Sequence, residues 1–198
     1  VKPFFSLSTK NAGTATEKKI IQVKDVLSKN SADYLLVTAP ENVAWILNIR
    51  GYDSSYSPIP NARLLVSKKG GIDLFTSPKK ITKIKRNLEK KICTHDERRI
   101  ENILKHMSKK RIWLDSLSCS FYYKSILGKR NSIIEKIDPI HFFKSIKNNT
   151  EIKNMKKSHL ADGVALTKFL FWIKKNFKKK IITEISAQKK LENFRKMN

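Results

Sequence analysis

The sequence predicts an α/β fold, a mixed sheet flanked by helices, with a helical segment after it. Three observations support this. Short apolar runs alternate with amphipathic helical patterns up to residue 138, and two such runs flank the Gly70-Gly71 pair as in a hairpin. After Asp138-Pro139 only helical periodicity remains. We therefore expect one domain over residues 1–138 and the first helices of an incomplete second domain over residues 139–198.

The helices of the first part are predicted from apolar residues at spacings of three and four. Ile20, Val23 and Leu27 place a helix over residues 16–29, with Thr16 at its cap. Pro40 suits the first position of the next helix. The same pattern predicts further helices over residues 40–48, 78–88, 98–107 and 118–127.

The strands are predicted from short apolar runs bounded by turn-forming residues. Residues 68–71 are the hairpin turn, and residues 50–60 form a loop rich in tyrosine and turn formers. The expected strands cover residues 33–38, 62–67, 72–76, 111–115 and 132–137.

The second part is predicted to be helical over residues 141–146, residues 150–177 and a segment opened by Thr183. On the long helix, His159 lies in the middle of a predicted buried stripe, with Gly163 one turn later. Spacing alone favours a core histidine bonded to Asp162, and the alternative is a histidine that points into a cleft. The stripe consists of Ile152, Met155, His159, Gly163, Leu166, Leu170 and Ile173.

The chain is strongly basic, with 42 Lys+Arg against 17 Asp+Glu and a formal net charge of +25. The excess consists of 34 lysines against 8 arginines, although bidentate phosphate recognition favours arginine. We therefore expect a solvated lysine-rich surface. Nucleic-acid binding by charge alone is the less favoured alternative.

Several classes of protein are excluded by the motifs. Cys93 and Cys119 lack a CxxC spacing, which excludes a disulfide-stapled scaffold and favours a cytoplasmic protein. The most apolar stretch, residues 164–173, is too short for a membrane span, and no signal peptide follows Val1. The four histidines form no HExxH motif, and the motifs predict no catalytic residue and no metal ligand in this chain.

Two blocks of sequence resemble aminopeptidase P (Xaa-Pro aminopeptidase), a metallopeptidase of the creatinase/pita-bread family. Residues 41–53, with Tyr56 and Pro58, are similar to the signature of that family's creatinase-like middle domain. The second block is similar to the opening of its catalytic domain. It covers residues 147–152, Met155, and residues 158–166, 172–175, 182–187 and 191–195.

The resemblance implies a three-domain hydrolase that removes the N-terminal residue preceding a proline. It implies two divalent metals, usually manganese, that activate a water, held by two Asp, one His and two Glu. These ligands would follow Asn198, and the family's first domain would precede Val1, so no cofactor is expected within this chain. His159 matches a histidine that contacts bound peptide, which reverses the preference from spacing.

The expected function is thus that of a part of an Xaa-Pro aminopeptidase, inactive alone, whose complete form acts on peptides with proline second. Residues 50–56 would border the cleft, form a homodimer surface, or simply support the sheet edge. The alternative is a binding or assembly module from a split or decayed gene, which pairs with a separately encoded catalytic half. Uncovered apolar helix faces over residues 150–195 motivate it.

Overall fold

The computed structural model describes residues 2–88, 92–179 and 181–197, and the chain forms two compact units, Val1–Lys147 and Asn148–Asn198. Unit 1 contains a six-stranded sheet in the order β6-β5-β4-β2-β7-β8. Strand β4 pairs antiparallel with both β2 and β5, and the remaining pairs are parallel, so the predicted mixed sheet is confirmed. The strands are β2 (Tyr34–Val37), β4 (Arg63–Ser67), β5 (Ile72–Phe75), β6 (Ile92–His95), β7 (Arg111–Leu114) and β8 (Ser132–Glu135).

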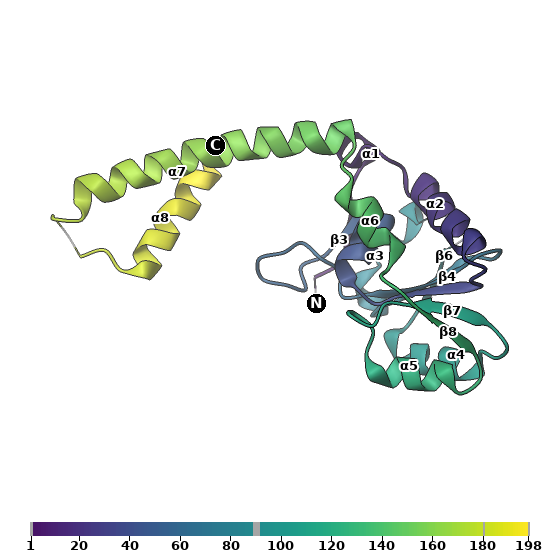
Figure 1. Cartoon of the computed structure of the whole chain (residues 1–198). Helices are drawn as coiled ribbons and strands as arrows, with labels where there is room; N and C mark the ends of the chain where they lie inside the picture. The colour runs from purple at the N-terminus through teal and green to yellow at the C-terminus, as the bar shows by residue number, and fades with distance from the viewer. Residues whose placement is uncertain (1, 89–91, 180, 198) are drawn as a thin grey trace. The chain divides into compact units, whose positions relative to one another are not determined.

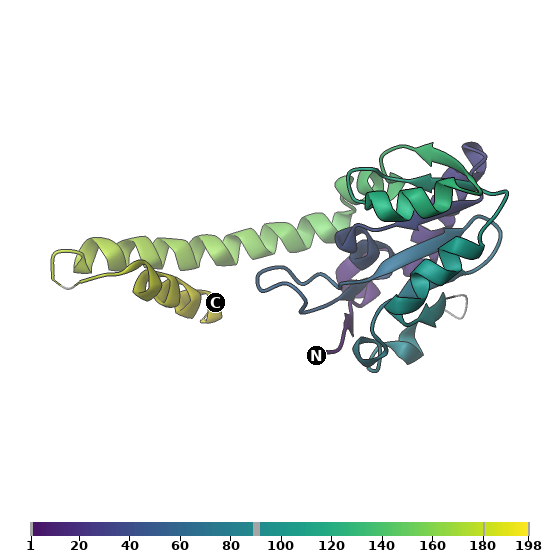
Figure 2. The same cartoon turned by 90° about the horizontal axis from the view of Figure 1, so that it is seen from below.

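Helices cover both faces of this sheet (Figures 1 and 2). Because side chains alternate along a strand, Leu35 and Val37 of β2 join one core cluster and Leu36 joins the other. The first cluster packs against α2 (Thr16–Lys29), α3 (Pro40–Ile46) and α6 (Pro139–Ser145). The second packs against α4 (Ile100–His106) and α5 (Phe121–Gly128).

Several predicted elements differ in detail from the structure. Residues 78–88 form two short 3₁₀ turns, η1 (Pro78–Lys80) and η2 (Lys85–Asn87), in place of one helix. Ile81 and Ile84 are nevertheless buried. The apolar spacing therefore predicted the buried residues correctly, but the prediction of a single α-helix was wrong. Ala15, and not Thr16, is the cap residue of α2.

The sequence analysis missed the shortest elements. Strands β1 (Phe5–Ser6) and β3 (Ile49–Arg50) form a separate antiparallel pair, and β6 extends the main sheet by one strand. Two-residue strands carry too little alternation to predict, and β6 has an apolar run of only two residues, Ile92 and Cys93. The helices α1 (Thr9–Ala12) and η3 (Glu97–Arg99) are equally short.

Helix α6 belongs to unit 1, although the sequence analysis placed residues 139–146 in the second domain. Ile140 is fully buried in the first core cluster. Asp138 caps the helix by accepting a hydrogen bond from the Ile140 amide at 2.8 Å. The division between the units therefore falls after Lys147. The assignment of the following helices to a catalytic domain stays a prediction.

Unit 2 is a helical hairpin of α7 (Asn149–Asn176) and α8 (Glu184–Lys196). Each helix begins with a capping box, from Asn148 and from Thr183, as the opening at Thr183 led us to expect. Asp162 of α7 forms a two-pronged ion pair with Arg195 of α8, at 2.6 and 3.4 Å. The Asp162–Arg195 ion pair therefore joins the two helices of unit 2 to each other.

A network of buried and half-buried polar side chains fastens α6 to the rest of unit 1. The Asp138 carboxylate, 2 % exposed, accepts from the Asn42 amide at 2.8 Å, and its backbone amide donates to Asp115 at 2.9 Å. The Asn42 carbonyl accepts from the Lys144 ammonium at 2.9 Å. Burial raises the pKa of Asp138, although the bonds from Asn42 and Ile140 oppose this.

We expect Asp138→Ala to destabilise unit 1 by about 2–4 kcal/mol, because it removes a helix cap and leaves the buried Asn42 amide without its acceptor. Urea unfolding of the 198-residue chain measures the change. The matched control, Asp25→Ala at an exposed position of α2, should cost less than about 0.5 kcal/mol. Equal losses in both variants would contradict the role given to Asp138.

The raised pKa also predicts a pH dependence. The folded state holds the Asp138 proton more tightly than the unfolded state, whose pKa is near 3.8. The Asp138 contribution to the free energy of unfolding therefore falls as pH rises from 3.8 through the folded pKa, and is level above it. We expect this decline to disappear in Asp138→Asn. The measurement is the free energy of unfolding of the unchanged chain minus that of Asp138→Asn at each pH. This difference should fall as pH rises, and a difference that rises with pH would contradict the assignment.

Candidate functional site

His159 lies on the surface of α7 and not in a core. Its side chain is exposed and borders a shallow groove of about 410 Å³ on that helix. Apart from Gly163, its chain neighbours and the adjoining helix backbone, no atom of the described residues lies within 4 Å of the position that a Cβ on Gly163 would take, so this part of the groove floor is open. The groove is lined by His159, Leu160, Gly163, Val164, Thr167 and Lys168.

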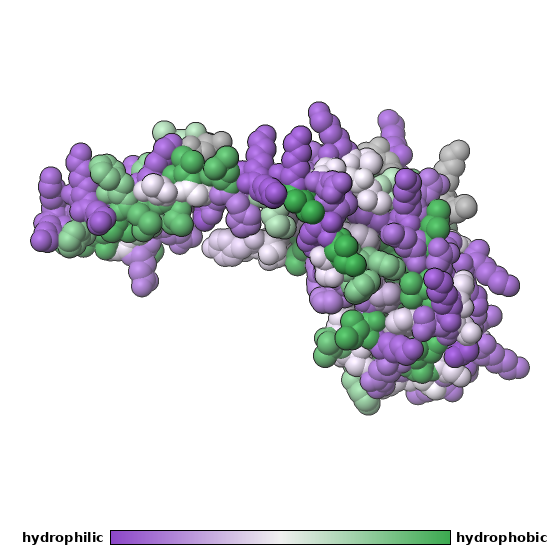
Figure 3. All heavy atoms as spheres, turned by 45° about the horizontal axis from the view of Figure 1, so that its top comes forward, coloured by the Kyte–Doolittle hydropathy of each residue, from purple (hydrophilic) through white to green (hydrophobic). Residues whose placement is uncertain are grey.

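The predicted buried stripe of α7 is wrong for the described structure. Met155 is 47 % exposed and Leu170 is 53 % exposed, and among the described side chains of α7 only Ala165 is buried. The helix α8 has 13 residues against the 28 of α7, and Leu166, like Met155 and Leu170, stays partly exposed at 42 %. Figure 3 shows apolar surface exposed on this unit. The spacing correctly found one apolar face, but periodicity does not show whether a partner covers that face.

The expected bond between His159 and Asp162 is replaced by the Asp162–Arg195 ion pair. The Arg195 guanidinium holds the pKa of Asp162 below its usual value, and His159 adds a smaller effect of the same sign. Both partners are about half exposed, so the pair contributes little to stability and serves mainly to orient α8 on α7. His159 therefore keeps its ring on an open apolar surface beside this pair.

The signature block, residues 41–53, is structural in unit 1. Lys19 of α2 is 1 % exposed, and its ammonium donates to the Trp45 carbonyl at 2.8 Å and to Asn48 Oδ1 at 2.7 Å. The same ammonium lies 4.2 Å from the centre of the Trp45 ring. Asn48 has a positive φ of 51° and its amide donates to the Thr14 carbonyl, so the block ties α2 to α3. The sequence analysis missed Lys19, because a single lysine on an amphipathic helix gives no signal of burial.

The loop after Arg50 is anchored at its base and exposed at its tip. A side chain on Gly51 would come within 2.9 Å of the Pro60 backbone, so only glycine fits there. Asp53 pairs with Lys80 at 2.8 Å and accepts from the Asn61 amide. Tyr56 is 90 % exposed. The base thus supports the sheet edge, while the proposed bordering or dimer role of the tip stays a prediction.

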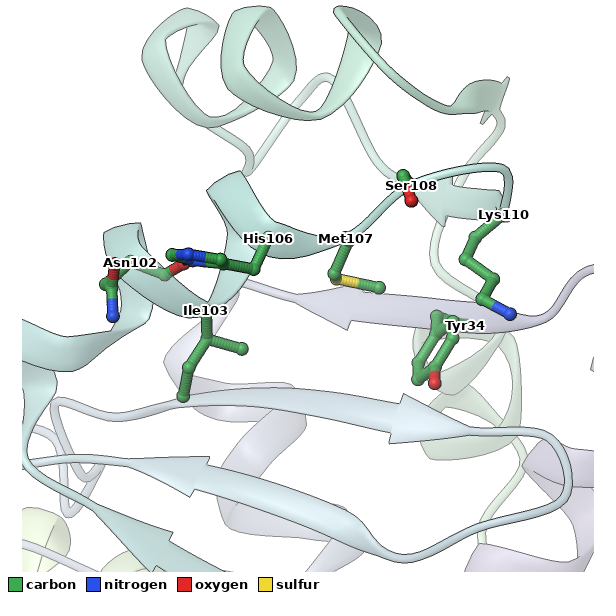
Figure 4. Close-up of a pocket in the computed structure, with 7 residues that line it drawn as sticks. All are labelled: Tyr34, Asn102, Ile103, His106, Met107, Ser108 and Lys110. Carbon is green, nitrogen blue, oxygen red and sulfur yellow. The ribbon is translucent and has the colours of Figure 1, made fainter.

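A larger hollow lies at the end of unit 1 where β7 begins, and the sequence analysis assigned nothing to it. It has a volume of about 630 Å³ (Figure 4). Its residues come from β2, α4 and the loop that follows α4. They are Tyr34, Asn102, Ile103, His106, Met107, Ser108 and Lys110.

The described residues do not fit the metal centre that the resemblance implies. Within residues 2–88, 92–179 and 181–197, no three side chains of His, Cys, Asp or Glu are grouped so that they could hold a metal ion. We therefore derive no chemical step through metals in this chain. In the same part of the chain, no helix has the length and apolar character required to cross a membrane.

Comparison with known families decides where the chain belongs. Residues 1–151 match the model of the creatinase/prolidase N-terminal domain, which covers unit 1 and the first residues of unit 2. The chain belongs to the creatinase/prolidase N-terminal domain family. This agrees with the resemblance found for residues 41–53.

Curated relatives extend the similarity through the second unit. The chain is 34 % identical to "Xaa-Pro aminopeptidase 1" of Dictyostelium discoideum, over 97 % of this chain and 31 % of that protein. It is 31 % identical to "Xaa-Pro aminopeptidase ApepP" of Drosophila melanogaster, over 96 % of this chain and 32 % of that protein. The chain thus spans about a third of the length of these relatives.

Solved structures show that the fold is shared. The X-prolyl aminopeptidase of Caenorhabditis elegans, described as a cytosolic enzyme with a di-nuclear active site, matches with a TM-score of 0.89. The match covers 100 % of this chain and 33 % of that one at 24 % identity. An Xaa-Pro dipeptidase from Bacillus anthracis gives a TM-score of 0.65 over 92 % of this chain at 17 % identity. The predicted α/β creatinase-like fold is confirmed.

We expect Lys19→Met to destabilise this family fold by about 2–4 kcal/mol, because the carbonyls of Trp45 and Asn48 lose a buried charged donor. Lys18→Met, one residue earlier and exposed, is the matched control and should change stability by less than about 0.5 kcal/mol. Thermal or urea unfolding measures both. Similar stability of the two variants would show that the buried amine is dispensable.

Proposed function

We propose that this chain is a supporting and substrate-bordering part of a metal-dependent Xaa-Pro aminopeptidase. The observation that carries the proposal is the extent of the match. Relatives named Xaa-Pro aminopeptidase align over 96–97 % of the chain, including the α7–α8 hairpin beyond the N-terminal domain family model. The substrate class would be peptides with proline in second position. The C. elegans protein is described as a cytosolic enzyme, which supports a cytoplasmic location for the present protein.

In this proposal His159 contacts bound peptide and is not a catalytic base. The groove beside it is mostly apolar, with Leu160 and Val164 along one side and the open position at Gly163. Such a surface accepts a ring like that of proline, while an imidazole donates or accepts one hydrogen bond at its edge. The Asp162–Arg195 pair one turn away would keep this part of α7 in place.

The metals belong to the complete enzyme in this proposal. Two manganese ions would supply an activated water and polarise the scissile carbonyl. The described residues group no ligand set, so polypeptide outside this chain would have to hold the ions. Residues of this chain would then shape the entrance and fix the position of α7.

We expect the purified 198-residue chain to show no release of the N-terminal residue from an Xaa-Pro peptide, with or without added manganese, because it groups no metal ligands. Mass spectrometry of the peptide measures the product. A complete relative, assayed alongside, controls for the substrate and the metal. Manganese-dependent cleavage by the chain alone would refute the proposal that the metal ions are held by polypeptide outside this chain.

We expect His159→Ala in the complete enzyme to lower kcat/KM for an Xaa-Pro peptide by about 10- to 100-fold, because a positioned hydrogen bond to the substrate is lost. His159 is exposed, so folding should not change. Lys157→Ala, exposed on the same helix, is the control and should change kcat/KM less than about twofold. If His159→Ala matches this control, His159 does not contact the peptide.

A further inference from the structure

The outer edge of strand β8 is a surface that the Xaa-Pro aminopeptidase function leaves unused. In the described part of the chain, β8 is the last strand of the six-stranded sheet and pairs with β7 alone (Figure 1). Its register with β7 continues without a break from Ser132 to Glu135, so no bulge interrupts the strand, and the strand contains no proline. A regular edge strand of this kind can pair with another extended segment.

The hydrogen bonds of β8 show which of its backbone groups point away from the sheet. The amides of Ser132 and Lys136 donate to carbonyls at either end of β7, at 2.9 and 3.2 Å. Because backbone groups alternate in direction along a strand, the amides and carbonyls of Ile133 and Glu135 point outward. Within the described residues, no loop, helix or side chain forms a hydrogen bond with these outward groups. They are therefore available to a further strand.

The side chains of β8 stand above and below the sheet and do not extend along it. Ile133 packs against the second core cluster, and Ile134 packs against the first. The Glu135 carboxylate lies 2.5 Å from the ammonium of Lys124 on α5. A strand added at this edge would therefore place its own side chains beside Ile133 on one face and beside Ile134 on the other.

An antiparallel segment satisfies the outward groups best. A residue directly opposite Ile133 and another directly opposite Glu135 would each exchange two hydrogen bonds with the residue that they face, which uses all the outward amides and carbonyls. A parallel segment would form slanted bonds, which are slightly less stable per residue. The geometry of the edge therefore favours antiparallel addition.

Charge decides which kind of segment fits. Lys129 and Arg130 are exposed shortly before β8 begins, and within the described residues neither forms an ion pair. Lys136, exposed directly after the strand, donates to the neutral Asn30 Oδ1 at 3.2 Å. A second copy of this chain, paired antiparallel, would bring its own Lys129 and Arg130 toward Lys136, and each copy has a net charge of +25. Repulsion therefore disfavours a second copy, whereas an acidic segment is attracted.

We propose that the outer edge of β8 binds an extended acidic peptide segment of a partner protein, which adds antiparallel to the sheet as a further strand. Because the segment runs antiparallel, its C-terminal end lies beside the start of β8. Its acidic residues therefore belong at that end, near Lys129 and Arg130. The main-chain bonds supply affinity, and the charges select the partner. The site does not depend on the proposed peptidase function.

The test uses a peptide of sequence Thr-Val-Thr-Val-Glu-Glu, labelled with fluorescein at its N-terminus and amidated at its C-terminus. Fluorescence anisotropy at constant ionic strength measures its binding to the full 198-residue chain. We expect saturable binding with a Kd of about 1 mM or tighter. The absence of binding in this range would overturn the site.

Two altered peptides separate the main-chain bonds from the charges. Thr-Val-Thr-Val-Lys-Lys keeps the strand-forming residues and should bind about tenfold more weakly or not at all. The acidic peptide with N-methyl groups on the two amides that face β8 keeps the charges and should also lose about tenfold in affinity. Equal binding of the lysine peptide would overturn the acidic assignment, and equal binding of the N-methylated peptide would overturn strand addition.

A proline at position 133 tests the edge from the side of the chain. Ile133→Pro removes an outward amide and leaves the amides of Ser132 and Lys136 that bond to β7, and proline is tolerated where an edge strand faces solvent. We expect the Kd for the acidic peptide to rise about tenfold, with the fold checked by circular dichroism. The N-methylated peptide tests the same bonds if this variant does not fold. A dimer of the unchanged chain that Ile133→Pro dissociates would assign the edge to a second copy and overturn the proposal.

Charge variants separate this edge from the general basicity of the chain. Lys129→Gln combined with Arg130→Gln should raise the Kd for the acidic peptide about fivefold or more. Lys79→Gln combined with Lys83→Gln removes the same charge from exposed positions in another part of unit 1 and should change the Kd by less than about twofold. Equal weakening by both pairs would overturn the role given to the cations beside β8.

Discussion

Burial of the central strands on both faces is the constraint on which unit 1 depends. Strand β2 lies between β4 and β7, and three of its four residues, Leu35, Leu36 and Val37, are at most 1 % exposed. A strand buried on both sides needs helices on both sides, and the chain supplies α2, α3 and α6 on one and α4 and α5 on the other. Removal of α6 would take Ile140 out of the first core cluster and would uncover the Asn42–Asp138 bond. This explains why the first unit continues past Asp138.

The same constraint separates what the sequence could predict from what it could not. Strands buried on two faces are continuous apolar runs, so residues 34–37 and 111–114 were found from the sequence. Strand β6 lies at the sheet edge and has only two apolar residues, Ile92 and Cys93, before the polar Thr94 and His95, so it was missed. The sequence analysis divides the chain at Pro139, where the composition changes, whereas the contacts of unit 1 continue to Lys147.

The candidate site was predictable to a different degree. The spacing predicted that His159 lies on the apolar face of a long, buried helix. The apolar face is present in the structure, but it is exposed to solvent. A pattern of apolar residues shows which face of a helix favours contact with another apolar surface. It does not show which element or partner supplies that surface.

The residues that identify the family in unit 1 hold the fold and do not carry out chemistry. Trp45 and Asn48 receive the buried ammonium of Lys19, Gly51 makes room for the Pro60 backbone, and Asp53 pairs with Lys80. A signature of this kind therefore identifies the scaffold and says nothing of the reaction. The argument for peptidase function rests instead on the α7–α8 hairpin, where the similarity to Xaa-Pro aminopeptidases continues beyond residue 151. If His159 makes no contact with peptide, the scaffold assignment stands and the functional role of α7 has to be sought in its exposed apolar face.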